Sequence, residues 1–450
     1  MLNRKLDNGG IVAMKIRKRI RSVVLLAALS TAAACGNPDE GGKAPGAGTK
    51  TPDQKEPVTL AFYWPYGNEE TFMKDYGDQI RKKFPHITAK LIPYKDTKQI
   101  DELVMTGEQL DVMAISIGSV DAFLLRLGLQ SDIIPYIAKY KTDLNQYEPA
   151  SIEILKQIGN GKIYGLPIFD VPSGVYYNKD IFDKFGVPYP KDGMTWDTMY
   201  ETAKRLTVKD GGTQYYGALI SASHLALRNP QSMNMIDPVT NKAALATDGW
   251  KSFLDNVTRF YQLPGMEWDK TKLQVANQGN MFMKDRTVAM WLPVSALYTE
   301  KELEGMNWDL AAFPTDVKNP GVGPQAYPFY MFVSQTSKHK EPAYEVISYL
   351  ASPEFQLELS KKGQYVSMLK NKEVRSAFGQ NSALYKGKNA KAFLAEKNAP
   401  PMQISKYNAS AGGQLFNAFI SVVTGVQDAN TALRIAEETV NKTIEADSKK

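Results

Sequence analysis

The sequence predicts an α/β fold with two lobes and a mainly parallel sheet flanked by helices. The first observation is the alternation of strand and helix patterns from Val58 onward, which is typical of parallel sheets joined by right-handed crossovers. The second is length, because the 416 residues after residue 34 exceed what a single hydrophobic core usually supports. The third is the single cysteine, Cys35, which excludes an internal disulfide, so packing must stabilise the fold.

Residues 1–34 have the pattern of a secretory signal peptide. The apolar run from Val23 to Ala34 is shorter than the roughly 20 residues needed to cross a bilayer core. A basic patch between Lys15 and Arg21 precedes this run, as in the charged region of a leader that stays on the cytoplasmic side. We therefore expect the rest of the chain to work outside the cytoplasm.

Cys35 follows the leader directly. The small residues before it and Gly36 after it resemble the lipobox of bacterial lipoproteins, which implies acylation of the thiol and a lipid anchor in the cell membrane. The alternative is ordinary cleavage after an Ala-x-Ala site, with Cys35 incidental. The segment that follows is mostly Gly, Pro, Lys and Asp, so we expect residues 35–57 to form a lipid-anchored flexible linker.

The first elements of the folded part alternate between strand and helix. They are a strand at 58–62, a helix with Phe72, Tyr76 and Ile80, a strand at 87–92, a helix with Ile100, Leu103 and Val104, and a buried strand at 111–116. Ligands of such sheets bind beyond the carboxyl ends of the strands. This rule selects Trp64 and Tyr66 after the first strand, Tyr94 after the second, and Ser116 to Ser119 after the third.

Later helices are indicated by their capping residues. Thr195 precedes an amphipathic helix in which we expect Trp196 to belong to the core. Pro342 and Pro353 are each expected at the first position of a helix. The second of these helices is expected to be capped by Ser352 and to end at Gly363. The last helix is expected from about Asp428, with a buried stripe of Ala429, Leu433, Ala436, Val440 and Ile444.

Charge and motif content exclude several classes of function. The leader holds seven of the 54 Lys and Arg residues and one of the 48 Asp and Glu residues, so the remainder carries 47 of each sign and is neutral. A nucleic-acid partner is therefore not expected. The three histidines lack metal-ligand spacing, and neither a nucleophile elbow nor a phosphate-binding loop is present, so we expect no metal, no cofactor and no catalysis. A secreted carbohydrate-active enzyme stays open as an alternative, although no Asp/Glu pair stands out by spacing.

Several segments resemble the solute-binding proteins of bacterial sugar ABC importers (family 1). They are Gly161 to Ile168, Gly174 to Phe182, Thr195 to Asp197, Gly279 to Met290, Asp309 to Pro314 and the helix pair at 341–363. The resemblance implies a periplasmic-binding-protein-like fold, in which two lobes joined by a hinge close over a solute and each lobe is a mainly parallel sheet flanked by helices. The expected crossings between the lobes are near 163–170 and 327–333. The implied first lobe comprises 58–165 and 328–390, and the second comprises 166–327 and 391–450.

The resemblance also implies a function and partners. We expect a monomeric, extracytoplasmic protein that captures a mono- or oligosaccharide and delivers it to the transmembrane subunits of an ABC permease. It would meet the membrane through its lipid anchor only. The alternative within the same fold is a peptide or polyamine as solute, and a polyamine site would need several carboxylates in the cleft.

Aromatic faces and polar groups that suit a sugar define the expected binding residues. Trp64 and Tyr66 follow from the strand-end rule and the implied first loop, and Ser116 follows from the strand-end rule. Trp291 and Ser295 follow a strand at 288–290, where the family places cleft residues. The first expected crossing adds Asp170 and Tyr176, and a structural role stays open for Tyr176 because it alternates with Tyr177 in a strand. Weaker candidates are Tyr327 and Phe329 at the second crossing and Tyr407 before the last helices.

Overall fold

The protein is described by a computed structural model that covers residues 55–65, 68–96, 98–294, 298–395 and 397–449. The expected leader, Cys35 and most of the expected linker lie outside these ranges. Within them, no helix has the length and apolar composition needed to cross a membrane.

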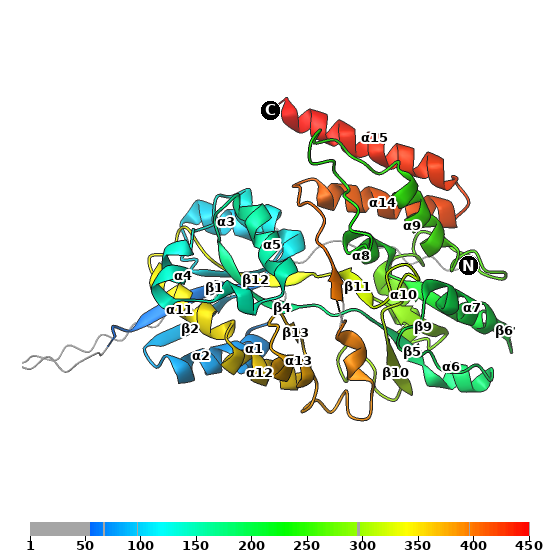
Figure 1. The fold of residues 1–450 in the computed structure, drawn as a ribbon, viewed down its shortest axis with the longest axis horizontal. Helices are drawn as coiled ribbons and strands as arrows, with labels where there is room; N and C mark the ends of the chain where they lie inside the picture. The colour runs from blue at the N-terminus through cyan, green and yellow to red at the C-terminus, as the bar shows by residue number, and fades with distance from the viewer. Residues whose placement is uncertain (1–54, 66–67, 97, 295–297, 396, 450) are drawn as a thin grey trace, which may run out of the picture. The chain divides into compact units, whose positions relative to one another are not determined.

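The strands of the described residues form two main sheets (Figure 1). The six-stranded sheet has the order β13-β4-β12-β3-β1-β2, and the four-stranded sheet has the order β10-β5-β9-β8. The first sheet contains β1 (Val58–Tyr63), β2 (Ile87–Ile92), β3 (Val112–Ser116), β4 (Gly165–Asp170), β12 (Pro328–Val333) and β13 (Val366–Ser367). The second contains β5 (Gly174–Asn178), β8 (Tyr216–Ile220), β9 (Val288–Leu292) and β10 (Trp308–Ala312). Two small sheets pair β11 (Val322–Gln325) with β14 (Lys397–Ala399), and β6 (Lys209–Asp210) with β7 (Thr213–Gln214).

Helices flank both main sheets. Those of the first lobe are α1 (Glu69–Phe72), α2 (Asp78–Lys83), α3 (Gln99–Thr106), α4 (Ile134–Tyr140), α5 (Pro149–Gly159), α11 (Lys340–Leu350), α12 (Pro353–Lys362) and α13 (Lys372–Ser376). Those of the second are α6 (Lys179–Lys184), α7 (Trp196–Leu206), α8 (Ala222–Leu227), α9 (Asp248–Thr258), α10 (Val275–Met283), α14 (Asn408–Val423) and α15 (Ala429–Ser448). Short 3-10 or π segments lie at Met73–Gly77, Ile117–Ser119, Asp121–Leu125, Leu144–Gln146 and Ala390–Phe393.

Most strands of each sheet run in one direction, which confirms the predicted α/β architecture. The pairings β1–β2, β1–β3 and β8–β9 are parallel. The sequence did not indicate the antiparallel strands inside each sheet: β12 lies between β3 and β4, and β5 lies between β9 and β10. Each of these two strands is the first strand after the chain has crossed from one main sheet to the other, because β5 follows β4 and β12 follows β10 and β11 along the chain.

Two separate hydrophobic cores correspond to the two sheets. The first gathers residues from Leu60 to Phe169 and from Tyr330 to Val374, and the second contains β5, β8, β9 and β10 with α14 and α15. The chain passes between the cores at Val171–Ser173, again at 313–327 through β11, and a third time near α13. The expected end of the first lobe was residue 390. Since Phe378, Tyr385 and Phe393 pack in the second core, the packing indicates an earlier boundary.

The capping predictions are confirmed with one exception. Thr195, Ser352 and Asp428 each accept a hydrogen bond from the backbone N–H three residues later, and Gly363 ends α12 with φ 73°. Trp196 is buried against aromatic rings of the second core, as expected. The prediction that Pro342 begins a helix was wrong, because α11 begins at Lys340 and Pro342 is its third residue. Proline is tolerated there because the first backbone N–H groups of a helix have no partner within the helix.

Candidate functional site

A cavity of about 710 Å³ lies between residues of the two lobes. The first lobe contributes Trp64, Asn68, Thr71, Phe72, Asp75, Tyr76, Phe329, Lys362, Gly363, Gln364 and Tyr365. The first connection contributes Val171, and the second lobe contributes Tyr298, Thr299, Glu300, Ser382, Ala383, Leu384 and Tyr385. The volume is in the usual range for a small-molecule site.

A stack of three aromatic rings borders this cavity. Phe169 lies between Tyr365, at 3.8 Å between ring centroids and 16° between planes, and Phe329, at 4.7 Å and 24°. The strand register explains the stack, because Phe169 in β4 is directly opposite Phe329 in the antiparallel neighbour β12. Phe169 itself is buried, whereas Phe329 and Tyr365 are half-buried and line the cavity. The ring faces therefore offer an apolar wall to a solute.

The tyrosine hydroxyls of the wall are neutral at ordinary pH. Burial raises the pKa of Tyr76 well above its usual value, and it raises the pKa of Tyr298 to about 12. The pKa of Tyr365 is also raised, mainly by burial and further by Asp75. The indole N–H of Trp64 and the hydroxyl of Tyr76 are buried without a hydrogen-bond partner among the described residues. Neutral hydroxyl and N–H groups beside aromatic faces suit an uncharged, hydroxylated solute.

Among the described residues, the charged side chains that line the cavity are one ion pair and one carboxylate without an ion-pair partner. The Lys362 ammonium lies 2.8 Å from Asp75 Oδ1, and Asp75 is buried. Glu300 is exposed and has no ion-pair partner among the described residues. Since Asp75 and Lys362 neutralise each other, this wall does not favour a strongly charged solute.

Of the expected binding residues, the structure places Trp64 in the cavity wall, at the carboxyl end of β1. Ser116 is buried at the end of β3, with its Oγ 3.4 Å from that of Ser119. Asp170 is buried and accepts a hydrogen bond of 2.7 Å from the backbone N–H of Tyr327. Both Asp170 and Tyr327 lie where the chain crosses between the lobes, outside the residues that line the cavity.

Three further expected residues lie in the second core. Trp291 and Tyr176 are directly opposite each other on β9 and β5 and are fully buried, and Tyr407 is buried before α14. The Trp291 indole N–H donates to the hydroxyl of Tyr298, which does line the cavity. Trp291 therefore supports a cavity residue from behind and presents no ring face to a solute in this structure. Tyr66 and Ser295 lie outside the described residues.

Sequence reasoning missed Tyr365, Tyr298 and Tyr385. One signal for Tyr365 was available, because Gly363 was expected to end α12, and Tyr365 follows two residues later at the turn into β13. No pattern pointed to Tyr298 or Tyr385, because each lies in an irregular loop and reaches the cavity only through tertiary packing.

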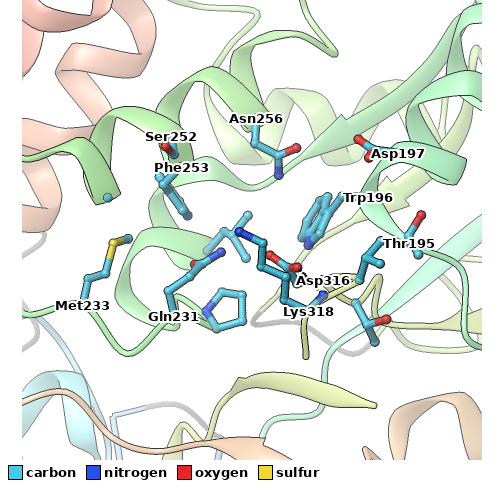
Figure 2. Close-up of a pocket in the computed structure, with 15 residues that line it drawn as sticks. Thr195, Trp196, Asp197, Gln231, Met233, Ser252, Phe253, Asn256, Asp316 and Lys318 are labelled. Atoms are coloured by element: carbon cyan, nitrogen blue, oxygen red, sulfur yellow. Dashed lines mark hydrogen bonds between the residues drawn. The ribbon is translucent and has the colours of Figure 1, made fainter. Parts of the chain in front are cut away.

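A second cavity of about 620 Å³ lies within the second lobe. Figure 2 shows the side chains around it, among them Trp196 of α7, Phe253 and Asn256 of α9, and Gln231 and Lys318. Every residue that lines it belongs to the second lobe or to the segment at 315–318. A solute bound there would contact one lobe and would have no differential affinity for lobe closure. The cavity between the lobes is therefore the better candidate for a solute site.

Comparisons with known proteins identify the family of this chain. The family described as "Bacterial extracellular solute-binding protein" matches residues 65–357. The arabinooligosaccharide-binding protein of Bacillus subtilis is 26% identical over 237 residues, which are 50% of this chain and 51% of that protein. The chain spans about half the length of the curated relatives it matches.

Two solved structures share the fold. One is an ABC substrate-binding protein from Listeria monocytogenes in complex with cycloalternan, at 18% identity and a TM-score of 0.69, covering 87% of this chain and 99% of that one. The other is the sugar-binding protein MalE from Xanthomonas citri, at 19% identity and a TM-score of 0.67, covering 87% and 98%.

Proposed function

Because this chain belongs to the bacterial extracellular solute-binding protein family, we propose that it captures an uncharged mono- or oligosaccharide in the cavity between its lobes. The observation that carries the proposal is the composition of that cavity. Ring faces of Phe329 and Tyr365, neutral tyrosine hydroxyls and the Trp64 indole converge there from both lobes. Sugars present this combination of apolar CH faces and hydroxyl groups.

The proposed mechanism is closure of the lobes around the solute. Since the cavity is lined from both lobes, a solute that fills it contacts more protein in a closed form than in an open one. Binding therefore shifts the population toward closure. The closed form would then dock on the transmembrane subunits of an ABC permease and release the sugar. The related arabinooligosaccharide-binding and MalE proteins support a saccharide as the solute.

The placement at the membrane is part of the proposal. The leader pattern and Cys35 support export and a lipid anchor, with the linker at 35–57 between the anchor and the folded part. The packing of the two cores supports a first lobe of about 58–170 and 328–376, with the remaining folded residues in the second. We expect the protein to act as a monomer and without catalytic activity.

A polyamine is a poor fit to the same cavity. Such a ligand needs several carboxylates, whereas Asp75 is already paired with Lys362 and only Glu300 of the described lining residues is an unpaired carboxylate. A peptide stays an alternative outcome of the ligand screen.

A thermal-shift screen of the purified chain against neutral sugars, acidic sugars, polyamines and short peptides tests the proposal. A ligand that binds only the folded form raises the melting temperature. We expect a rise with one or more neutral saccharides. In Tyr365→Ala the affinity for that saccharide should fall about fivefold or more, because a lost stacking contact costs about 1 kcal/mol.

The matched control is Tyr189→Ala, which removes a tyrosine of the second lobe that does not line the cavity. Its affinity should equal that of the wild type. A rise only with polyamines or peptides, or equal affinities in both variants, would contradict the proposal.

A further inference from the structure

A buried arginine lies where the chain crosses between the two lobes. Arg228 follows α8 of the second lobe, and its backbone N–H donates to His224 O at 3.1 Å. It is 1% exposed. Burying an arginine costs several kcal/mol unless its donors are satisfied, so its partners indicate what it holds in place.

The guanidinium of Arg228 donates to carbonyls of three different segments. Nη1 donates to Val171 O of the first connection at 2.8 Å and to Val294 O after β9. Nε donates to Gln325 O of β11, in the second connection, at 2.8 Å. The Gln325 N–H in turn donates to Arg228 O at 3.1 Å, so the second connection is held from both directions.

The side chain of Gln325 extends this network to a further segment. Its amide nitrogen donates to Asn229 O at 2.8 Å, and its amide oxygen accepts from the backbone N–H of Met402 at 2.7 Å. Met402 belongs to the return segment, residues 400–407. This segment contacts the first lobe, because the Ile404 N–H donates to Gln157 of α5, and then enters the second core at Tyr407. Arg228 and Gln325 thus contact the segment that follows β4, the end of β11 and the segment that follows β14.

The partner on the first-lobe side is held less tightly. Arg228 Nη2 lies 3.7 Å from Asp170 Oδ2, which is an ion pair but longer than a hydrogen bond. Asp170 Oδ1 accepts the Tyr327 N–H, and the Tyr327 ring centroid is 6.0 Å from the guanidinium. Arg228 therefore makes short hydrogen bonds to Val171 and Gln325, but only longer electrostatic contacts to Asp170 and Tyr327.

We propose that Arg228 is the positioning residue of the hinge. It fixes the connections at Val171 and Gln325 to the second lobe, so that lobe rotation at these two connections takes place in the backbone between Asp170 and Val171 and between Ala326 and Tyr327. Lysine could not replace it, because one ammonium cannot reach three carbonyls in the planar arrangement that a guanidinium offers. The inference rests on the proposed function, since solute capture gives a hinge its purpose, but its test needs no solute.

The experiment measures the distance between the lobes in the ligand-free chain. Spin labels are attached to Met105→Cys in the first lobe and Val239→Cys in the second, in a Cys35→Ser background, because both positions are highly exposed. Pulsed dipolar spectroscopy then gives the width of the interlobe distance distribution. We expect a narrow distribution in this parent and one at least twice as wide in Arg228→Lys, with near-native circular dichroism.

Three further variants separate the network from general stability. Arg259→Lys, at a surface ion pair with Asp197, should keep the parent width. Asp170→Asn should also keep it, because the carbonyl contacts of Arg228 stay intact. Asp170→Asn combined with Arg228→Met, which leaves no unpaired buried carboxylate, should widen the distribution at least as much as Arg228→Lys. A folded Arg228→Lys chain with the parent width would overturn the proposal, whatever the solute screen shows.

Discussion

Gly118→Ala should destabilise the protein through a single steric contact. A Cβ atom on Gly118, in the segment after β3, would lie 2.1 Å from the Tyr327 hydroxyl oxygen and 3.1 Å from its Cζ. The phenol would have to move by more than about 1 Å, and overpacking of this kind costs roughly 1–3 kcal/mol.

Tyr327→Phe provides the matched test, since it removes the atom that clashes. The new Cβ would then be limited by the contact of 3.1 Å, which a shift of a few tenths of an ångström relieves. Tyr327→Phe alone is the reference for the double variant, because it removes the hydroxyl without adding the Cβ atom. The double variant should be about as stable as Tyr327→Phe, so the two changes should not be additive.

The assay is urea unfolding followed by tryptophan fluorescence and by circular dichroism, with the two transitions required to coincide. A stability of Gly118→Ala equal to that of the wild type would refute the steric argument. So would additive losses in the double variant.

Three other predictions address charge and anchoring. Lys362→Met leaves the buried carboxylate of Asp75 unpaired and should lower the free energy of unfolding by about 1–3 kcal/mol. Adding Asp75→Asn should restore part of this free energy. An unchanged free energy of unfolding in urea would contradict the prediction. Burial and the neighbouring Arg228 lower the pKa of His224 from 6.5 to about 4. Between these two pH values the folded state binds fewer protons than the unfolded state. The free energy of unfolding should therefore fall as the pH drops through this window, by about 3 kcal/mol at most. His224→Gln should lose less stability than the wild type between pH 7.5 and 4.5, and equal losses would count against the assignment. Cys35→Ser should release the protein from membranes into the soluble fraction, and retention in the membrane fraction would count against a lipid anchor.

The fold was predictable because its first elements have strong local patterns. The strands at β1 to β3 and the caps at Thr195, Ser352 and Asp428 depend on periodicity and on side chains near in sequence. The insertion of β12 between β3 and β4 was not predictable in this way. The residues of β12 pair with residues more than 150 positions away in the sequence, and a local sequence pattern does not predict such a pairing.

The cavity was less predictable than the fold. Trp64 was found because the end of a parallel strand is a local position with a general meaning. The same reasoning failed to separate Trp291 from the residues that line the cavity, because alternation along a strand shows that neighbours face opposite sides but not which side is covered. Tyr365 and Tyr385 reach the cavity from segments near the third passage of the chain, which only the packing of both cores defines.

The late arrival of β12 has a consequence for the order of assembly. Until residues 328–333 have been synthesised, β3 and β4 each lack their shared neighbour, and the amino-terminal part of the chain cannot complete its sheet. Pairings of such high sequence separation form slowly. The six-stranded sheet can therefore reach its full strand order only after β12, and later β13, have left the ribosome.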